Sequence, residues 1–597
     1  MNFYNFTGGM VNRKSPYLMK TDELLQLRNF DIEGGGLTIR KGTKKLYGPY
    51  DKPVDSIHKA LSAKGHEILF IKTGETAQMV VGGVACNGSL LCTTFQVLPV
   101  TNGFAYLVGG IGRQMIPVYR RCDEYVKMTY QWEGALVIEK LPDDYTTDGE
   151  FPADLYEKNI WDVSTDSLYY AVAHTAATKE NIQNLLQTNA FVRIGGRGDV
   201  LHMQFGEQNE YVLNLKTGYC GSSFFTVWVE DNFLNLFPDV PTMSDTAKWA
   251  CACPYFVWHP ASMRYFAAGH PDNPTALYVS EPNEWYNFSS YNVLYPHLHL
   301  GSITGLLVVE KSVVVCYEHG WSHYVGADPM VDGQWSLLSV PDGTNYGKTI
   351  CLTPGSVSFF TGGELLSFSS SMLTVQMLYS PSSSLYKFLS KEKLSLPTSP
   401  EKAFAYYKDG NYYLALDNVL YVYHVSLGAF TCYDGFSCSC ITEDYQGRIL
   451  MGNKNCVVCF DSSLSTDYNP ETEENEPISY EAKFPVLGAV SENELARCSE
   501  VVVKHCGGGE GLRCTVKLTS EREHCEGNLT PSNHLQYGIS PWNRRYYSSH
   551  FSETVFPWRV SGNMFCLEIS GGTAPGDTVP FSVLNIYLEL KKERNKL

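Results

Sequence analysis

The sequence predicts an all-β protein, and three observations lead to this fold class. Aromatic residues make up 13% of the 597 residues, and glycine (51) and proline (29) are frequent. Aromatic and β-branched side chains fit a pleated surface, while Gly and Pro close the turns between strands. From residue 55 onward, short runs of alternating apolar residues are each ended by a glycine or an Asn/Asp turn. This alternation is the pattern of half-buried strands.

The strand runs recur in a meander about every 40 to 50 residues, which is the spacing of β-propeller blades. The clearest case is residues 408–424, a hairpin in which Asp417 and Asn418 suit a tight turn. We therefore predict a degenerate β-propeller with an inserted mixed segment, an N-terminal arm and a C-terminal β-sandwich. An array of β-sandwiches would give similar short strands and is the alternative.

Breaks in the strand pattern indicate the domain boundaries. Residues 141–190 resemble an insertion that ends in a short capped helix near 178–187. The run from Asp467 to Pro477 is acidic and poor in apolar residues, as linkers are. The predicted order is an N-terminal docking arm (1–54), the first part of the propeller (55–140), the insertion (141–190), the rest of the propeller (191–465), an acidic linker (466–477) and a C-terminal β-sandwich with a basic tail (478–597).

Charge is distributed unevenly along the chain. The total is −17, but the first 50 residues hold eight Lys or Arg and four acidic residues, so they carry +4 and the remainder carries −21. Proteins that grip nucleic acid present basic surfaces to the phosphates, and the acidic body argues against that class. The basic N-terminal segment would suit docking onto an acidic neighbour. The candidate docking residues are Arg13, Lys14, Arg28, Arg40, Lys41, Lys44 and Lys45.

Motifs that carry chemistry are weak in this sequence. No nucleophile elbow, phosphate-binding loop or intact dinucleotide fingerprint is present. The Cys456–Cys459 pair has redox spacing but lies in a strand-like run, so we expect core cysteines, reduced like the rest. His297 and His299 are the best hint of a metal site and lack a third ligand nearby. We therefore expect no catalytic residues, no metal and no cofactor.

Two further expectations concern export and membranes. The first nine residues have neither the charged nor the apolar region of a Sec-type signal peptide. The most apolar stretch, 303–317, is interrupted by Glu310 and Lys311, which leaves it too short to span a membrane. We expect no secretion by that route and no membrane span.

Several short phrases are distributed over nearly the whole chain. They are GGMVN (8–12), SPYL (15–18), ELLQLRNF (23–30), GGLTIRKG (35–42), MRYFAAGHPDNP (263–274), LYVSEP (277–282), ITGL (303–306), YVG (324–326) and the strand pair at 564–590. Together these phrases resemble the β-propeller tail proteins of double-stranded DNA phages, in particular the tail nozzle and packaged-DNA-stabilisation (tail accessory) proteins of short-tailed phages.

The resemblance implies a structural, non-enzymatic component of the virion tail, made in the host bacterial cytoplasm. Such a protein forms a homo-oligomer, a hexameric ring or tube, that retains packaged DNA and conducts it during ejection without sequence-specific binding. Its implied partners are tail adaptor or portal-proximal proteins and other tail or fibre proteins. A negatively charged lumen would repel the phosphates of the passing DNA, and the acidic body could supply that negative charge.

Two other classes fit a chain of propeller and sandwich domains. One is a host-facing tail adhesin, and the other is a carbohydrate-binding or carbohydrate-hydrolysing propeller whose aromatic residues stack on sugars. Fold alone does not separate these functions.

Overall fold

A computed structural model gives the fold of the chain. It describes residues 2–3 and 5–61, the strands between 67 and 230 together with Gly74, and 245–592 apart from 283–286, 327, 332–334, 374–385, 389–393, 489–494, 508–512, 530–551 and 574–580. Strands dominate the described residues, and their only α-helix is α2 (Asp245–Ala252). The all-β prediction is confirmed.

Antiparallel meanders of four consecutive strands follow one another along the chain. Three of them, β22 to β25, β26 to β29 and β30 to β33, are separate four-stranded sheets, whereas β8 to β11 belong to an eight-stranded sheet and β34 to β37 to a ten-stranded sheet. Their bounds are β8 (Val54–Leu61), β9 (Glu67–Thr73), β10 (Thr76–Val81), β11 (Val84–Leu91); β22 (Tyr255–His259), β23 (Arg264–His270), β24 (Asn273–Val279), β25 (Val293–Leu294); β26 (Ile303–Val309), β27 (Ser312–Tyr317), β28 (Gly320–Val325), β29 (Trp335–Leu337); β30 (Cys351–Thr353), β31 (Ser356–Thr361), β32 (Glu364–Ser369), β33 (Tyr386–Phe388); β34 (Ala403–Lys408), β35 (Asn411–Leu416), β36 (Val419–His424) and β37 (Ala429–Tyr433).

The predicted hairpin at 408–424 forms as expected. Leu416 of β35 lies opposite Val419 of β36, and the turn between them places Asp417 at φ 53°. Asp and Asn tolerate this left-handed conformation better than most other residues, so the sequence at this turn fits its geometry.

The last small sheet takes its fourth strand from the other end of the chain. Strands β38 (Ile441–Glu443), β39 (Ile449–Asn453) and β40 (Cys456–Asp461) are joined by β7 (Gly42–Tyr47), with Lys44 opposite Cys459. Two three-stranded sheets lie between the β8 and β22 sheets in sequence, and four further strands extend the β8 sheet. These are β12 (Phe95–Val100), β13 (Gly103–Gly109), β14 (Met115–Tyr119), β15 (Tyr125–Gln131), β16 (Leu136–Lys140), β17 (Leu168–Ala173), β18 (Ala190–Ile194), β19 (Val200–Leu201), β20 (Leu213–Asn214) and β21 (Phe224–Glu230).

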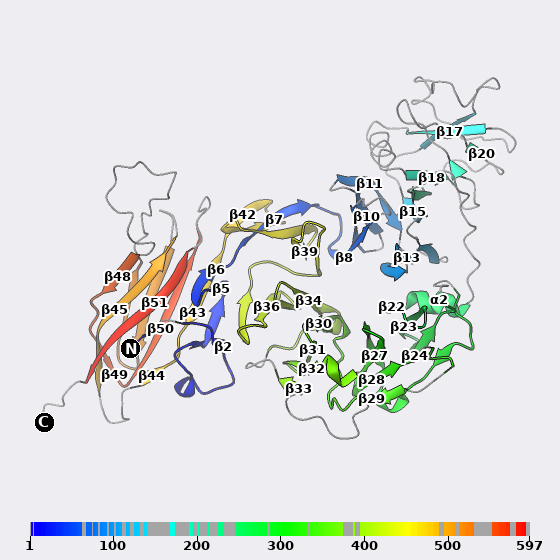
Figure 1. Cartoon of the computed structure of the whole chain (residues 1–597). Coiled ribbons are helices and arrows are strands. Elements are labelled where there is room, and N and C mark those ends of the chain that lie inside the picture. The colour runs from blue at the N-terminus through cyan, green and yellow to red at the C-terminus, as the bar shows by residue number, and fades with distance from the viewer. Residues whose placement is uncertain are drawn as a thin grey trace.

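The first strands of successive sheets lie against one another. Contacts join β8 to β12, β12 to β22, β22 to β26, β30 to β34, β34 to β38, and β38 back to β8. The pair β26 and β30 does not appear in this series of contacts. Between them in sequence lies a 3-10 turn, η4 (Gly347–Thr349), which contacts both β26 and β34. Figure 1 shows the sheets placed around a common centre in this order.

Hydrophobic side chains between adjacent sheets hold them face to face. Trp321 of β28 packs against Phe359 of β31 and Phe368 of β32, with ring centroids 4.9 and 5.1 Å apart, and all three rings are buried. Fully burying an aromatic side chain contributes about 1.5–3 kcal/mol. Similar cores join each neighbouring pair of sheets from β22 round to β8.

A second unit, here called the two-sheet unit, combines residues 2–40 with described residues of 478–592. One sheet has the order β48-β45-β51-β6-β5, and the other continues the β34–β37 sheet through β4-β43-β50-β46-β47. Both sheets contribute to one hydrophobic core. The strand bounds are β1 (Asn2–Phe3), β4 (Gln26–Arg28), β5 (Phe30–Glu33), β6 (Gly36–Ile39), β43 (Ser479–Lys483), β44 (Leu487–Gly488), β45 (Ala496–Cys506), β46 (Arg513–Ser520), β47 (His524–Asn528), β48 (Ser552–Phe556), β49 (Val560–Gly562), β50 (Met564–Gly572) and β51 (Ser582–Lys592).

The structure corrects the prediction of a separate arm at 1–54. Strands β1, β5 and β6 pair within the two-sheet unit, β4 lies between β37 and β43, and β7 completes the β38–β40 sheet. The physical reason is the apolar content of this segment: Leu24, Leu27 and Phe30 are fully buried. The basic residues that suggested an arm lie between these core positions.

The predicted acidic linker at 466–477 is a hairpin instead. Strand β41 (Thr466–Asn469) pairs with β42 (Glu474–Pro477), and its first three residues are buried. Most of the acidic residues that suggested a linker occupy the exposed strand and turn, whereas Asp467 is buried in β41. The helix predicted within the insertion 141–190 lies outside the described residues. None of the described helices has the length and apolarity of a membrane span.

Candidate functional site

The seven basic residues predicted to dock a partner lie on several different elements of the fold. Arg13 and Lys14 lie in the loop between β2 (Gly9–Met10) and β3 (Glu23–Leu24). Arg28 lies on β4, Arg40 follows β6, and the three remaining lysines lie at or just before β7.

Internal carboxylates partner the basic residues of the first loop. Arg13 forms an ion pair with Glu364 at the start of β32. Lys14 donates to Glu23 over 2.6 Å, and the same buried carboxylate accepts the backbone N–H of Lys20 at 3.0 Å. Glu23 therefore holds the loop through two hydrogen bonds, whereas Arg13 and Lys14 remain partly accessible at the surface of the loop.

Arg40 is not available to a partner, which corrects its assignment as a docking residue. Its side chain is only 1% exposed and forms two hydrogen bonds with Asp467, at 2.9 and 2.5 Å. It also donates to Asn29 Oδ1 at 2.7 Å and to the carbonyl of Asp434 at 2.8 Å. Its guanidinium lies over the ring of Phe436. Arg40 thus joins the N-terminal segment to the 466–477 hairpin.

The lysines around β7 differ in exposure. Lys41 and Lys44 are exposed, while Lys45 is half-buried and its ammonium lies 5.4 Å from the centroid of the Tyr468 ring. Lys41 and Lys44 therefore remain the accessible pair of this group.

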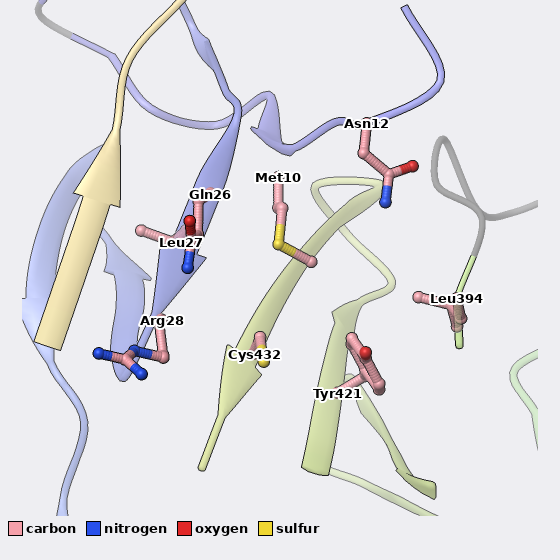
Figure 2. A pocket seen from close by; sticks show the side chains of 8 residues that line it. All are labelled: Met10, Asn12, Gln26, Leu27, Arg28, Leu394, Tyr421 and Cys432. Carbon is pink, nitrogen blue, oxygen red and sulfur yellow. The ribbon is translucent and has the colours of Figure 1, made fainter. Parts of the chain in front are cut away.

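A cleft of about 200 Å³ lies where the β34–β37 sheet meets the two-sheet unit. Strands β37 and β4 are paired only at Cys432 and Arg28, and the N–H of Asn29 donates to the Cys432 carbonyl at 2.7 Å. Figure 2 shows Met10 between these two strands, with Tyr421 and Leu394 on the far side. The lining residues are Met10, Asn12, Gln26, Leu27, Arg28, Leu394, Tyr421 and Cys432.

The chemistry of this lining suits binding rather than catalysis. Arg28 is held by Asp434 at 3.4 Å and by Glu481 at 3.8 Å. None of the eight lining residues is a carboxylate or an imidazole, so the lining itself provides no general base for the Cys432 thiol. The cleft offers apolar surface with amide and guanidinium donors.

An ion cluster lies where the first strands β8, β34 and β38 meet. Glu443 accepts hydrogen bonds from Lys408 at 2.7 Å and from Lys59 at 2.5 Å. The Lys408 ammonium, followed by Lys59, holds the pKa of Glu443 below its ordinary value. Burial, with the Glu443 charge adding to it, raises the pKa of Tyr406 to about 12. A single ionised carboxylate between two ammonium groups connects the three strands.

Sequence reasoning missed this cluster because its members come from three distant segments. Lys59, Lys408 and Glu443 are each ordinary charged residues at strand ends. No motif or spacing in the sequence relates them.

Replacing Glu443 with Gln is expected to lower the free energy of unfolding by about 1 kcal/mol at pH 7, because solvent screens partly exposed pairs. The folded-state pKa of Glu443 lies below 4.5, so its contribution is present above that pH and is lost as the pH falls through the folded value. Urea unfolding should therefore show a smaller difference in the free energy of unfolding between the parent and Glu443→Gln near pH 4 than at pH 7. Glu474→Gln, at an exposed position, is the control, and an equal loss at both pH values would contradict the prediction.

The cysteine and histidine candidates have structural positions. Cys456 and Cys459 are buried in β40, and burial raises the pKa of both thiols. The predicted core role of this pair is confirmed. His297 precedes the 3-10 turn η3 (Leu298–Leu300) and His299 lies within it, with the two ring centroids 5.7 Å apart. Within the described part of the chain, no three His, Cys, Asp or Glu side chains gather closely enough to hold a metal ion.

Comparisons with known proteins give no family. No protein-family model and no curated protein match the chain. Similar solved structures include exo-β-1,3-galactanase from Phanerochaete chrysosporium, at 9% identity over 56% of this chain and 95% of that chain, with a TM-score of 0.21.

Two further solved structures are similar at the same level. Streptogramin B lyase is 6% identical over 71% of this chain and 98% of that chain, with a TM-score of 0.33. PorZ, a bacterial surface component of the type-IX secretion system of Porphyromonas gingivalis, is 8% identical over 91% of this chain and 86% of that chain, with a TM-score of 0.28. TM-scores this low support no argument about function.

Proposed function

We propose that this chain is a structural, non-enzymatic subunit of a phage tail, a nozzle or tube ring that retains packaged DNA and conducts it during ejection. In this proposal the subunit assembles into a homohexamer in the virion and meets adaptor, portal-proximal and fibre proteins. It needs no cofactor.

One observation carries the proposal beyond the sequence phrases themselves. The opening phrase at 35–42 contains β6, and the closing phrase at 564–590 contains β50 and most of β51. Strand β6 pairs with β51, with Thr38 opposite Ser582 and their hydroxyl groups 2.9 Å apart. The two ends that resemble phage tail proteins therefore belong to one folded unit, which is expected if the resemblance reflects a shared architecture.

The proposed architecture is a β-propeller joined to a β-sandwich. Seven sheets begin with β8, β12, β22, β26, β30, β34 and β38, and the last takes β7 from the N-terminal segment. In this architecture β7, from the N-terminal segment, completes the sheet of β38 to β40 and so closes the ring of sheets. The two-sheet unit would then be the sandwich, fixed to the propeller through β4.

Charge supports a passive wall for DNA. The chain outside its first 50 residues carries −21, which disfavours binding to phosphates. Lys41 and Lys44, with Arg13 and Lys14 at the loop surface, are the accessible basic residues that would meet an acidic tail partner.

Negative-stain microscopy and light scattering of the purified full chain test this proposal. The expected result is six-fold rings with the mass of a hexamer. A monodisperse monomer at every concentration tested would contradict the proposed ring.

A virion readout separates tail proteins from other propellers. Gold-labelled antibody against the chain should bind at the tail of intact phage particles produced from the same host. Labelling absent from particles would exclude the virion location, whatever the purified protein does in solution.

A further inference from the structure

We propose a saccharide-binding surface on the β22–β25 sheet and helix α2, here called the aromatic patch and made of Trp249, His270, Asp272, Asn273 and Tyr295. The ligand class is an uncharged, hydroxyl-rich sugar such as a hexose unit of a surface polysaccharide. This inference goes beyond the proposed structural role and does not depend on the assembly state of the chain.

Helix α2 exposes Trp249 while burying its other face. Ala247, Ala250 and Cys253 recur at intervals of three residues and are fully buried. This interval places Ala247 and Ala250 on one side of the helix, with Cys253 directly after its end, and Trp249 points away from that side. Its side chain is 47% exposed, and it is the only exposed tryptophan among those whose side chains the structure describes. The small residues make the core contact of this helix.

The Trp249 ring is held in a fixed orientation. It stacks on the buried imidazole of His270, with ring centroids 5.2 Å apart and planes 20° from parallel. The backbone N–H of Asp272 donates to His270 Nδ1 at 3.1 Å, which fixes the orientation of the imidazole. An exposed aromatic face supported from behind is preorganised for a flat apolar ligand surface.

A tight turn places polar groups beside this ring. His270 of β23 pairs with Asn273 of β24, and Pro271 and Asp272 between them are exposed. The Asn273 amide donates to the Tyr295 hydroxyl at 3.0 Å, which fixes a second ring that is 47% exposed. One half-exposed ring thus stacks on His270 at the start of the turn, and the other is hydrogen-bonded to Asn273 at its end.

This set of groups matches a sugar better than a charged ligand. A pyranose has an apolar C–H face, which packs on an aromatic ring, and hydroxyl groups at its rim that both donate and accept hydrogen bonds. Trp249 and Tyr295 supply the rings, Asp272 and Asn273 supply acceptors, and the Asn273 amide supplies a donor. The formal charge of the patch is the single carboxylate of Asp272, which disfavours phosphates and nucleic acids.

The test uses the full chain, fluorescently labelled and applied to an array of hexose-, N-acetylhexosamine- and deoxyhexose-terminated oligosaccharides. Calorimetry with each bound oligosaccharide then gives its affinity. Trp249→Ala is expected to weaken binding about tenfold or more, while Trp249→Phe keeps part of the affinity. Asn273→Ala should weaken binding less, because it releases Tyr295 without removing a ring.

Tyr291→Ala is the matched control. Tyr291 is 90% exposed and lies four residues before Tyr295, outside the patch. Its replacement should leave both binding and the unfolding midpoint unchanged, and the midpoint of each patch variant should stay close to that of the parent. Absence of binding to every oligosaccharide at about 1 mM, or equal binding by the parent and Trp249→Ala, would overturn the inference. Either result leaves the ring assembly of the proposed function untouched, since that is measured separately by microscopy.

Discussion

Replacing Arg40 with Ala is expected to lower the free energy of unfolding by about 3–5 kcal/mol, the range for breaking a buried ion pair. The side chains of Arg40 and Asp467 are 1% and 7% exposed and share two hydrogen bonds. Without the guanidinium, the Asp467 carboxylate is left in a site that excludes water. The hydroxyl of Thr43, which donates to Asp467 at 3.1 Å, compensates only in part.

Urea unfolding of three variants isolates the cause. Asp467→Asn should lower the free energy of unfolding by a similar amount, because it leaves the Arg40 charge buried without its carboxylate partner. The double variant Arg40→Met, Asp467→Leu should be more stable than either single change, since it removes both charges and keeps apolar volume. Lys41→Ala, at an exposed neighbouring position, should stay within about 0.5 kcal/mol of the parent. A loss for Arg40→Ala no larger than that for Lys41→Ala would mean that the pair does not join the two segments.

Local patterns were sufficient to predict the strands of the small sheets. The run at 408–424 alternates apolar residues around Asp417 and Asn418, and the structure has the expected hairpin there. Such hairpins depend on neighbours in sequence, so their signal survives in a single chain.

Long-range pairing is what the sequence could not reveal. Arg40 lies in a short run of polar and basic residues, which is typical of a surface, and its burial depends on Asp467, 427 positions away. The segment 466–477 resembles a linker in composition because its turn and second strand are acidic, and the burial of Thr466, Asp467 and Tyr468 has no signal in that composition. A cleft lined by Met10, Leu394 and Cys432 likewise has no local signature.

Deleting residues 1–40 is expected to abolish the folding of the two-sheet unit, giving insoluble protein. The segment supplies β1 and β6, which pair with β51, and β4, which lies between β37 and β43. It also supplies Phe3 and Phe6, both fully buried, whose rings pack edge-on against Phe484 at 5.2 and 5.9 Å. Each buried side chain of this kind contributes about 1.5–3 kcal/mol, and the summed loss for the whole segment exceeds the 5–15 kcal/mol by which domains are stable.

The deletion distinguishes an integral segment from a docking arm, because the loss of an arm would leave a soluble, folded body. The measurements are the soluble yield and the protection of the β45 and β51 amides from hydrogen exchange. Coexpression of residues 1–40 as a separate peptide should restore the yield and the protection. A matched control replaces Tyr17 and Leu18 of the loop, which are exposed, with Gly and Ser and should fold normally. If the deleted chain stayed soluble with protected β51 amides, the core contributed by Phe3 and Phe6 would be dispensable. The N-terminal basic residues would then be free to act as the arm that their charge first suggested.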